Sequence, residues 1–178
     1  VAKAAGQTGG PKATKILQTL MTDLTAEVRV GVCQGCDAMG GNASVDILSA
    51  LIDDKVIDVR MAAAVALAGP QNAAADKVAE LLLDRDPEIR IKAAGLLAEM
   101  DTPRAIQPLI DALGDANPNV RYFVRAALLA LAAFGLTLGE TSELLLDEAN
   151  PVPRLDLHRD RRVRLQVSCT IGTVGGRP

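Results

Sequence analysis

The chain has 178 residues, a formal net charge of -3 at pH 7 and a hydrophobic content of 49%. Its aromatic residues are one Tyr and two Phe, with no Trp, so small and aliphatic side chains dominate, which favours close-packed helices over a sheet. The charge excludes a whole-protein basic field for nucleic acid or an anionic membrane, and no run of about 18 apolar residues predicts a membrane span.

Three cysteines are an odd number, which does not fit a framework of disulfides. A reducing compartment is the simpler interpretation, so the sequence predicts a cytoplasmic protein. The first residues do not have the pattern of a signal peptide. Because residue 1 is Val and not Met, a removed leader stays an open alternative.

An arginine recurs along the chain at a nearly constant spacing. Its four copies stand 31, 30 and 31 residues apart, and an aspartate precedes each copy by six residues. Self-similarity at such a period is the signature of a solenoid built from stacked structural repeats. The aspartate and arginine pairs are Asp23 and Arg29, Asp54 and Arg60, Asp84 and Arg90, and Asp115 and Arg121.

The first residues match the end of a repeat. Residues 1–17 align with residues 32–48 at an offset of 31, which superposes the Gly-Gly pair at 9–10 on the pair at 40–41. Residues 1–10 are therefore predicted to be a partial repeat. We expect a segment of a longer array, because a terminal repeat normally carries a polar cap and this start does not.

Each full unit is predicted to contain two helices that a short turn with Asp, and often Pro, connects. Helix starts are predicted at Asn42 or Ser44, at Asn72 and at Thr102-Pro103, because these residues cap or begin a first turn well. Glycines close the second helices. The predicted first helices span residues 12–24, 44–52, 73–83 and 103–113, and the predicted second helices span 27–39, 58–68, 88–100 and 119–134.

The repeats predict an all-α fold, an α-solenoid of about four and a half stacked helical hairpins over residues 1–154. From Arg154 onward there are six Arg against two Asp, so residues 155–178 form an atypical tail of another composition. This tail is a flexible end, a cap over the last repeat, or sequence foreign to the native protein. The predicted repeats span about 11–41, 42–71, 72–101 and 102–139, and a fifth begins at 140–154 without its second helix.

The repeat motif resembles a known family. Residues 84–97 and 115–128 follow the pattern Asp-x-(Asp/Asn)-Pro-x-(Val/Ile)-Arg-x-x-Ala-Ala-x-x-Leu most closely. This pattern is similar to HEAT-like repeats of the type found in phycocyanobilin lyase subunits, and the resemblance extends to about residue 154. Pro108 also resembles the family, whose first helices are often kinked at such a proline. Because the family includes scaffolds, adaptors, lyase subunits and a few enzymes, the resemblance implies the fold more strongly than the function.

The recurrent aspartates and arginines are predicted to form a structural ladder. In a stacked array, these columns bring each arginine near the acidic residue of its own or the next turn. A catalytic site is expected once in a protein and not four times, so we assign these residues to the fold.

Other candidate reactive residues also favour structural roles. Cys33 and Cys36 have the spacing of a redox or metal motif, but their positions hold Ala or Leu in the other repeats, which favours packing in the core. His158 is the only histidine and has no recognisable Ser or Cys partner. We therefore predict no catalytic residue, no metal site and no cofactor.

The best functional signal is a surface of the second helices. At 100° per residue, the residues one before, three after and seven after each arginine point together and are predicted to form the core. The residues one and five after the arginine point nearly the opposite way and are mostly apolar. This stripe is predicted to lie on the concave face as a groove for a partner, and its candidate contacts are Val30, Met61, Val65, Ile91, Tyr122 and Phe123.

The preferred hypothesis is a non-enzymatic scaffold or adaptor that binds a protein or peptide on its concave face, with no nucleic acid and no membrane as partner. A second hypothesis, implied by the resemblance, is a subunit of a bilin lyase or isomerase. A third is a structural spacer in a larger protein. Coverage of the stripe by the chain's own tail, by a further repeat or by tight curvature is the alternative to partner binding.

Overall fold

The computed structural model describes residues 1–133 of the chain. Our predictions for residues 134–178 lie outside the described residues. They concern the end of the last second helix, the start of a fifth repeat at 140–154, and the tail at 155–178 with His158 and Cys169.

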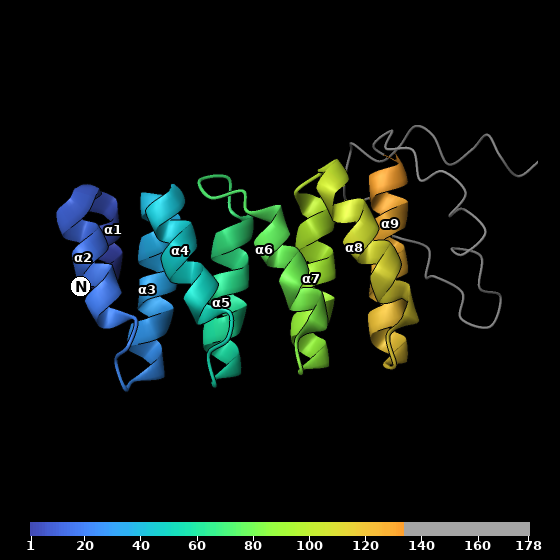
Figure 1. Cartoon of the computed structure of the whole chain (residues 1–178), viewed down its shortest axis with the longest axis horizontal. Helices are drawn as coiled ribbons and strands as arrows, with labels where there is room; N and C mark the ends of the chain where they lie inside the picture. Colours follow the sequence, from blue (N-terminus) through green and yellow to red (C-terminus); the bar gives the residue numbers. More distant parts are fainter. Residues whose placement is uncertain (134–178) are drawn as a thin grey trace, which may run out of the picture.

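The described residues form two layers of helices along one axis (Figure 1). Over residues 1–133 the structure is all-α, with no strand, and it is an α-solenoid of helical hairpins, as the repeats predict. The first layer comprises α2 (Gly10–Leu20), α4 (Asn42–Leu51), α6 (Ala75–Glu80) with η1 (Leu81–Leu83), and α8 (Ile106–Asp111) between η2 (Pro103–Ala105) and η3 (Ala112–Gly114). The second layer comprises α1 (Ala2–Thr8), α3 (Ala26–Met39), α5 (Ile57–Ala68), α7 (Pro87–Glu99) and α9 (Pro118–Ala133).

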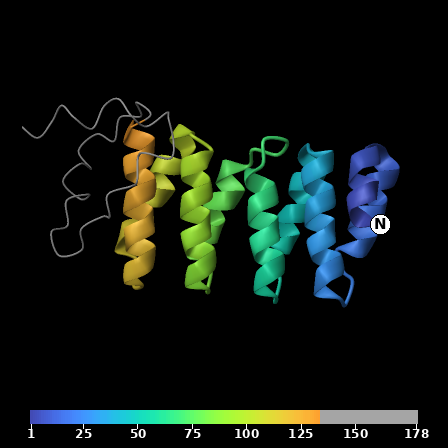
Figure 2. The same cartoon turned by 180° about the vertical axis from the view of Figure 1, so that it is seen from behind.

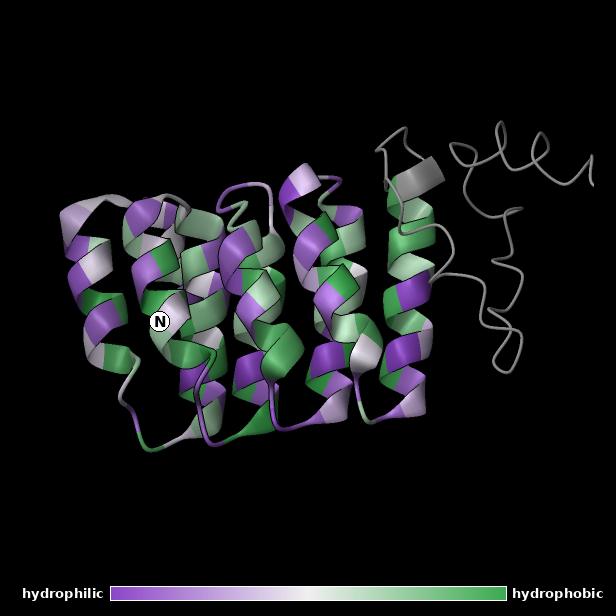
Figure 3. Cartoon of the chain, turned by 45° about the vertical axis from the view of Figure 1, so that its right-hand side comes forward, coloured by the Kyte–Doolittle hydropathy of each residue, from purple (hydrophilic) through white to green (hydrophobic). Residues whose placement is uncertain are grey.

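Seen from behind, α3, α5, α7 and α9 stand side by side in one row (Figure 2). We call the outward side of this row the second-helix face. It is the face predicted to be concave, and all six candidate contacts belong to these four helices. Hydrophobic and hydrophilic residues alternate along the helices of both layers, as amphipathic helices require when only one side of each is buried (Figure 3).

The core lies between the two layers and between neighbouring second helices. In α5 it takes Val59, Ala63 and Leu67, all fully buried and all at the positions that helical spacing predicts. Val28, at the first of these positions in α3, is only half-buried. The reason is that α1 is short and aligns with residues 33–39, so it covers only the second half of α3.

Glycines permit two local features near the start of the array. Gly40 and Gly41 have φ angles of 68° and 77°, a backbone region that essentially only glycine adopts, and they make the tight turn from α3 to α4. Gly35 of α3 packs directly on the backbone of α1, because a Cβ at this position would lie 2.6 Å from the Ala2 carbonyl oxygen. Close backbone packing therefore joins α1 to α3.

Of the predicted helix starts, the one at Asn42 or Ser44 is confirmed at Asn42, where α4 begins, and the one at Asn72 is wrong. Asn72 does not cap a helix: α6 begins at Ala75, and the Asn72 amide donates to the Ala66 carbonyl at the end of α5, 2.7 Å away. Ser44 is buried inside α4 and donates to the Gly40 carbonyl. Thr102 does cap the following turn, since its side chain accepts from the Arg104 N–H.

The first helix predicted at 103–113 is divided into a 3-10 turn, a short α-helix and a second 3-10 turn. Pro108 lies in the first turn of α8, where its missing N–H leaves no helical hydrogen bond unmade. The change from 3-10 turn to α-helix therefore lies at Ile106, two residues before the proline. The first helix predicted at 73–83 likewise ends in a 3-10 turn, η1.

Candidate functional site

The recurrent charges form a ladder that ties each repeat to the next. Arg29 of α3 donates from Nε and Nη2 to the carboxylate of Asp54, at 2.6 and 2.9 Å. Its Nη1 donates to the Asp23 carbonyl oxygen in the turn of its own repeat. The carboxylate of the next repeat and the carbonyl of the same repeat thus hold one guanidinium. Equivalent rungs join Arg60 to Asp84 at 2.8 Å and Arg90 to Asp115 at 2.7 Å.

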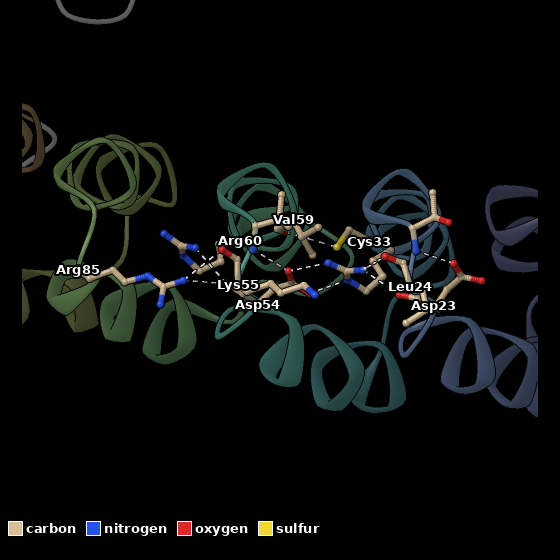
Figure 4. Close-up of polar contacts among 11 residues, drawn as sticks. Asp23, Leu24, Cys33, Asp54, Lys55, Val59, Arg60 and Arg85 are labelled. Atoms are coloured by element: carbon tan, nitrogen blue, oxygen red, sulfur yellow. Dashed lines mark hydrogen bonds and ion pairs between the residues drawn. The ribbon is translucent and has the colours of Figure 1, made fainter.

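Each ladder aspartate also orders its own turn. The Asp54 carboxylate accepts the Val56 N–H at 2.8 Å, and Asp84 and Asp115 accept in the same way from residues 86 and 117. Figure 4 shows this arrangement around Asp54, whose carboxylate faces α3 while Arg60 reaches back to the Asp54 carbonyl. One side chain therefore both shapes a turn and pairs with the preceding repeat.

These contacts change the ionisation of the ladder groups. The hydrogen bonds from Arg29 lower the pKa of Asp54, and the same bonds raise the pKa of Arg29. Burial would raise the pKa of Asp115, but the hydrogen bonds from Arg90 and the Asn117 N–H outweigh it and lower that pKa. Both carboxylates are thus held ionised by fixed donors, which suits a structural role and not proton transfer.

The two described cysteines are buried and reduced. Burial raises the pKa of Cys33 to about 12, with a further contribution from Cys36, and burial raises the pKa of Cys36 to about 11. A thiol with such a pKa is almost entirely protonated at neutral pH, so it is a poor nucleophile. Within residues 1–133, no group of three or more His, Cys, Asp or Glu side chains could hold a metal ion.

The candidate contacts on the second-helix face are exposed to different extents. Val65 and Phe123 are 46% and 44% exposed, and Leu129, which the sequence analysis did not select, is 37% exposed. Tyr122 is half-buried and meets Phe123 edge to face, with ring centroids 5.2 Å apart. The remaining contacts, Val30, Met61 and Ile91, are half-buried and pack against the core.

A groove of about 310 Å³ lies between two neighbouring second helices and is called the α3–α5 groove. Its carboxylates, Asp37 of α3 and Asp58 of α5, are both exposed. Neither carboxylate was predicted from the sequence as a site residue. The groove exists because Ala62 leaves space there, whereas α7 carries Lys92 and α9 carries Phe123 at the same position of the repeat. It is lined by Cys33, Gln34, Asp37, Asp58, Met61, Ala62, Val65 and Ala66.

A second groove of about 430 Å³ lies in the first layer, between α6 and α8. It is also rimmed by carboxylates, but this chain supplies cations for three of them. Asp76 pairs with Arg104 at 3.0 Å and Glu80 with Lys77 at 2.8 Å, while the ladder holds Asp115. In the α3–α5 groove, no ion pair or hydrogen bond within residues 1–133 engages the side chain of Asp37 or Asp58. Its two negative charges are therefore not balanced within the described residues, and this smaller groove favours a bound cation more strongly than the larger one.

One buried arginine was not predicted from the sequence. Arg125 of α9 is 3% exposed and donates from Nε to the Arg121 carbonyl at 3.3 Å. It occupies the position that Cys33, Ala64 and Ala94 hold in the other second helices. Arg125 could have been found from the sequence, because an arginine stands where the other repeats have a small side chain.

Comparison with known proteins identifies the family. A search of curated proteins found no match. Within the described residues, no helix combines the length and the apolar character needed to cross a membrane. The profile of the family described as HEAT repeats matches residues 1–68 and 75–157, which is most of the sequence. With this match and the stacked helical hairpins that the structure describes, the chain belongs to the HEAT-repeat family.

Proposed function

We propose that this chain is a non-enzymatic interaction scaffold that binds a peptide or helix of a protein partner on its second-helix face. The observation that carries the proposal is the series of apolar side chains on that face, in particular Val65, Phe123 and Leu129, each more than a third exposed. Exposed apolar groups on α5 and α9 favour a partner that removes them from water.

The chemistry of these side chains suits partner recognition. Tyr122 and Phe123 are aromatic neighbours, and aromatic side chains are frequent energetic anchors in interfaces. Met61 is flexible and polarizable, so it adapts to partners of different shape. The aromatic pair and Met61 lie on different second helices, which suits a partner that spans several repeats.

The ladder supports this function indirectly. Because each rung connects two repeats through two hydrogen bonds to a buried carboxylate, the second helices are held in a fixed relation to one another. A binding surface that is ordered before the partner arrives loses less conformational entropy on binding. We therefore assign the ladder a supporting role and not a contact role.

Selection of binding peptides would test the proposal. A displayed library of random peptides is selected on the chain and counter-selected on the double variant Val65→Glu/Phe123→Glu, whose positions are exposed enough to accept charge. Peptides that bind the wild type and lose affinity for the double variant are the expected result. The matched control is Leu83→Glu, at an 88% exposed leucine in the first layer, which should not affect binding.

Two outcomes would contradict the proposal. In the first, the library yields no peptide that binds the wild type more tightly than the double variant. In the second, Leu83→Glu reduces peptide affinity as much as the double variant does. A bilin lyase or isomerase subunit would instead bind a linear tetrapyrrole and acquire a visible absorption band, which can be measured on the same samples. A spacer would bind neither the peptides nor the tetrapyrrole.

A further inference from the structure

We propose that the α3–α5 groove is a receptor for lysine or arginine side chains, so that the partner segment is basic and amphipathic. This inference rests on the proposed function and adds the charge of the partner. The groove joins an apolar floor, with Met61 and Val65, to two carboxylates, Asp37 and Asp58. Among the described residues, no lysine or arginine lines it.

The position of Asp37 makes the groove particularly favourable for a cation. Asp37 lies in the last turn of α3, and its Oδ1 approaches the C-terminal end of α5 so closely that a Cβ at Gly69 would lie 2.5 Å from it. Helix C-termini carry partial negative charge from unpaired carbonyl groups. A carboxylate beside two helix C-termini therefore concentrates negative potential, which a bound cation would relieve.

The next second helix carries a basic residue at the repeat position where α5 has none. In α7, Glu88 and Lys92 stand four residues apart, a spacing at which opposite charges on a helix attract. In α5 the equivalent residues are Asp58 and Ala62, so the acidic group is kept while the basic group is missing and the groove is open. A lysine or arginine of the partner would occupy the space that Lys92 takes in the next repeat.

The geometry also limits the partner segment. Asp58 stands two residues before its arginine and Asp37 eight residues after its own, so ten positions of the repeat separate them. At a rise of about 1.5 Å per residue this corresponds to about 15 Å along the helices. Two basic residues about seven positions apart on a partner helix, with apolar residues between them, match this length once the reach of the side chains is included.

Matched synthetic peptides would test this proposal. The probe is a fluorescently labelled, capped peptide of about twelve residues, built from Leu and Ala with Lys at two positions seven apart. Counterparts carry Gln or Glu in place of Lys, and affinity for the full chain is measured by fluorescence anisotropy. We expect the Lys peptide to bind at least about fivefold more tightly than the Gln peptide, and the difference to shrink as salt is added.

Two variants of the chain locate the effect. Asp37→Asn/Asp58→Asn removes the charges and keeps the shape, and Ala62→Lys places a lysine in the groove, as α7 does. Both should weaken binding of the Lys peptide about fivefold or more. The control is Asp46→Asn, which removes one carboxylate at an exposed position of α4 in the first layer and should leave the affinity unchanged. Circular dichroism confirms that each variant is folded.

The outcomes separate this inference from the proposed function. If the Gln peptide binds as tightly as the Lys peptide and only Val65→Glu/Phe123→Glu abolishes binding, the proposed function stands and the basic partner is overturned. Unchanged affinity for the Lys peptide in the Ala62→Lys variant would also overturn it. If no peptide binds, and library selection also fails, both the partner chemistry and the proposed function are wrong.

Discussion

The turns between the two helices of each hairpin and the second-helix face differ in what recurs from one repeat to the next. At the turns, the same aspartate and arginine make the same contacts at each of three junctions, at 2.6 to 2.8 Å. On the second-helix face, the position two residues after the arginine is Gly31, Ala62, Lys92 and Phe123 in successive repeats. The recurring aspartates and arginines serve the stacking of repeats. The variable residues after each arginine distinguish one part of the second-helix face from another.

The largest expected effect comes from breaking a rung of the ladder. Asp84→Ala leaves the Arg60 guanidinium buried without its carboxylate, in a pair whose side chains are only 4% and 7% exposed. The free energy of unfolding should fall by about 3 kcal/mol, as for other buried pairs that lose one partner. Denaturant unfolding of the variant and the wild type measures this.

The control for that rung is the exposed pair of Arg104 and Asp76, whose side chains are 74% and 71% exposed. Arg104→Ala should change stability by less than about 0.5 kcal/mol, because solvent screens an exposed pair. Equal losses in the two variants would show that the ladder does not hold the repeats together.

A smaller effect is expected where α1 packs on α3. Gly35→Ala places a Cβ 2.6 Å from the Ala2 carbonyl oxygen and 2.7 Å from a methyl group of Leu17, which should cost about 2 kcal/mol. The matched control is Gly95→Ala in α7, where a Cβ would meet nothing within 4 Å. That variant should gain about 0.5 to 1 kcal/mol, because alanine is the better helix former. Thermal unfolding distinguishes the two, and a stabilising Gly35→Ala would contradict the close packing.

Acid should weaken the ladder. The pKa of Asp54 is lowered in the folded chain, first by the hydrogen bonds from Arg29. A carboxylate of this kind stabilises the fold above its unfolded pKa of about 3.9, and the contribution is lost as pH falls through the lower folded value. In denaturant unfolding between pH 5 and about pH 2, Asp54→Asn should lose less stability than the wild type. If the wild type and Asp54→Asn lose the same stability on acidification, the rung between Arg29 and Asp54 is not the source of the acid sensitivity.

Much of the fold could be predicted from the sequence because its signals are periodic. The spacing of the four arginines identifies the solenoid, and the positions around each arginine identify core residues such as Val59 and Leu67. The start of α6 was not predictable from residue type alone. Asn72 is a common capping residue, but here a carbonyl at the end of the preceding helix competes successfully for its amide.

The α3–α5 groove could not be predicted from the repeats, for a physical reason. A comparison of repeats emphasises what they share, whereas this groove is lined at one position by a small residue, Ala62, where the two following repeats carry Lys92 and Phe123. Its acidic rim combines Asp37 of one repeat with Asp58 of the next, 21 positions apart in the sequence. Only the packing of α3 on α5 shows that these residues line one space.

The smallest expected effect on stability comes from the second-helix face. Ala62→Lys should change the free energy of unfolding by less than about 0.5 kcal/mol, because Ala62 is half-buried beside open space and α7 already carries Lys92 there. The reciprocal Lys92→Ala should be similarly mild, with both measured by denaturant unfolding. If the free energy of unfolding falls by about 2 kcal/mol or more in either variant, this position stabilises the fold and is not only a surface position. A mild change in stability, together with a large change in peptide affinity for Ala62→Lys, would show that a single residue can alter what one repeat binds while the ladder beneath it stays intact.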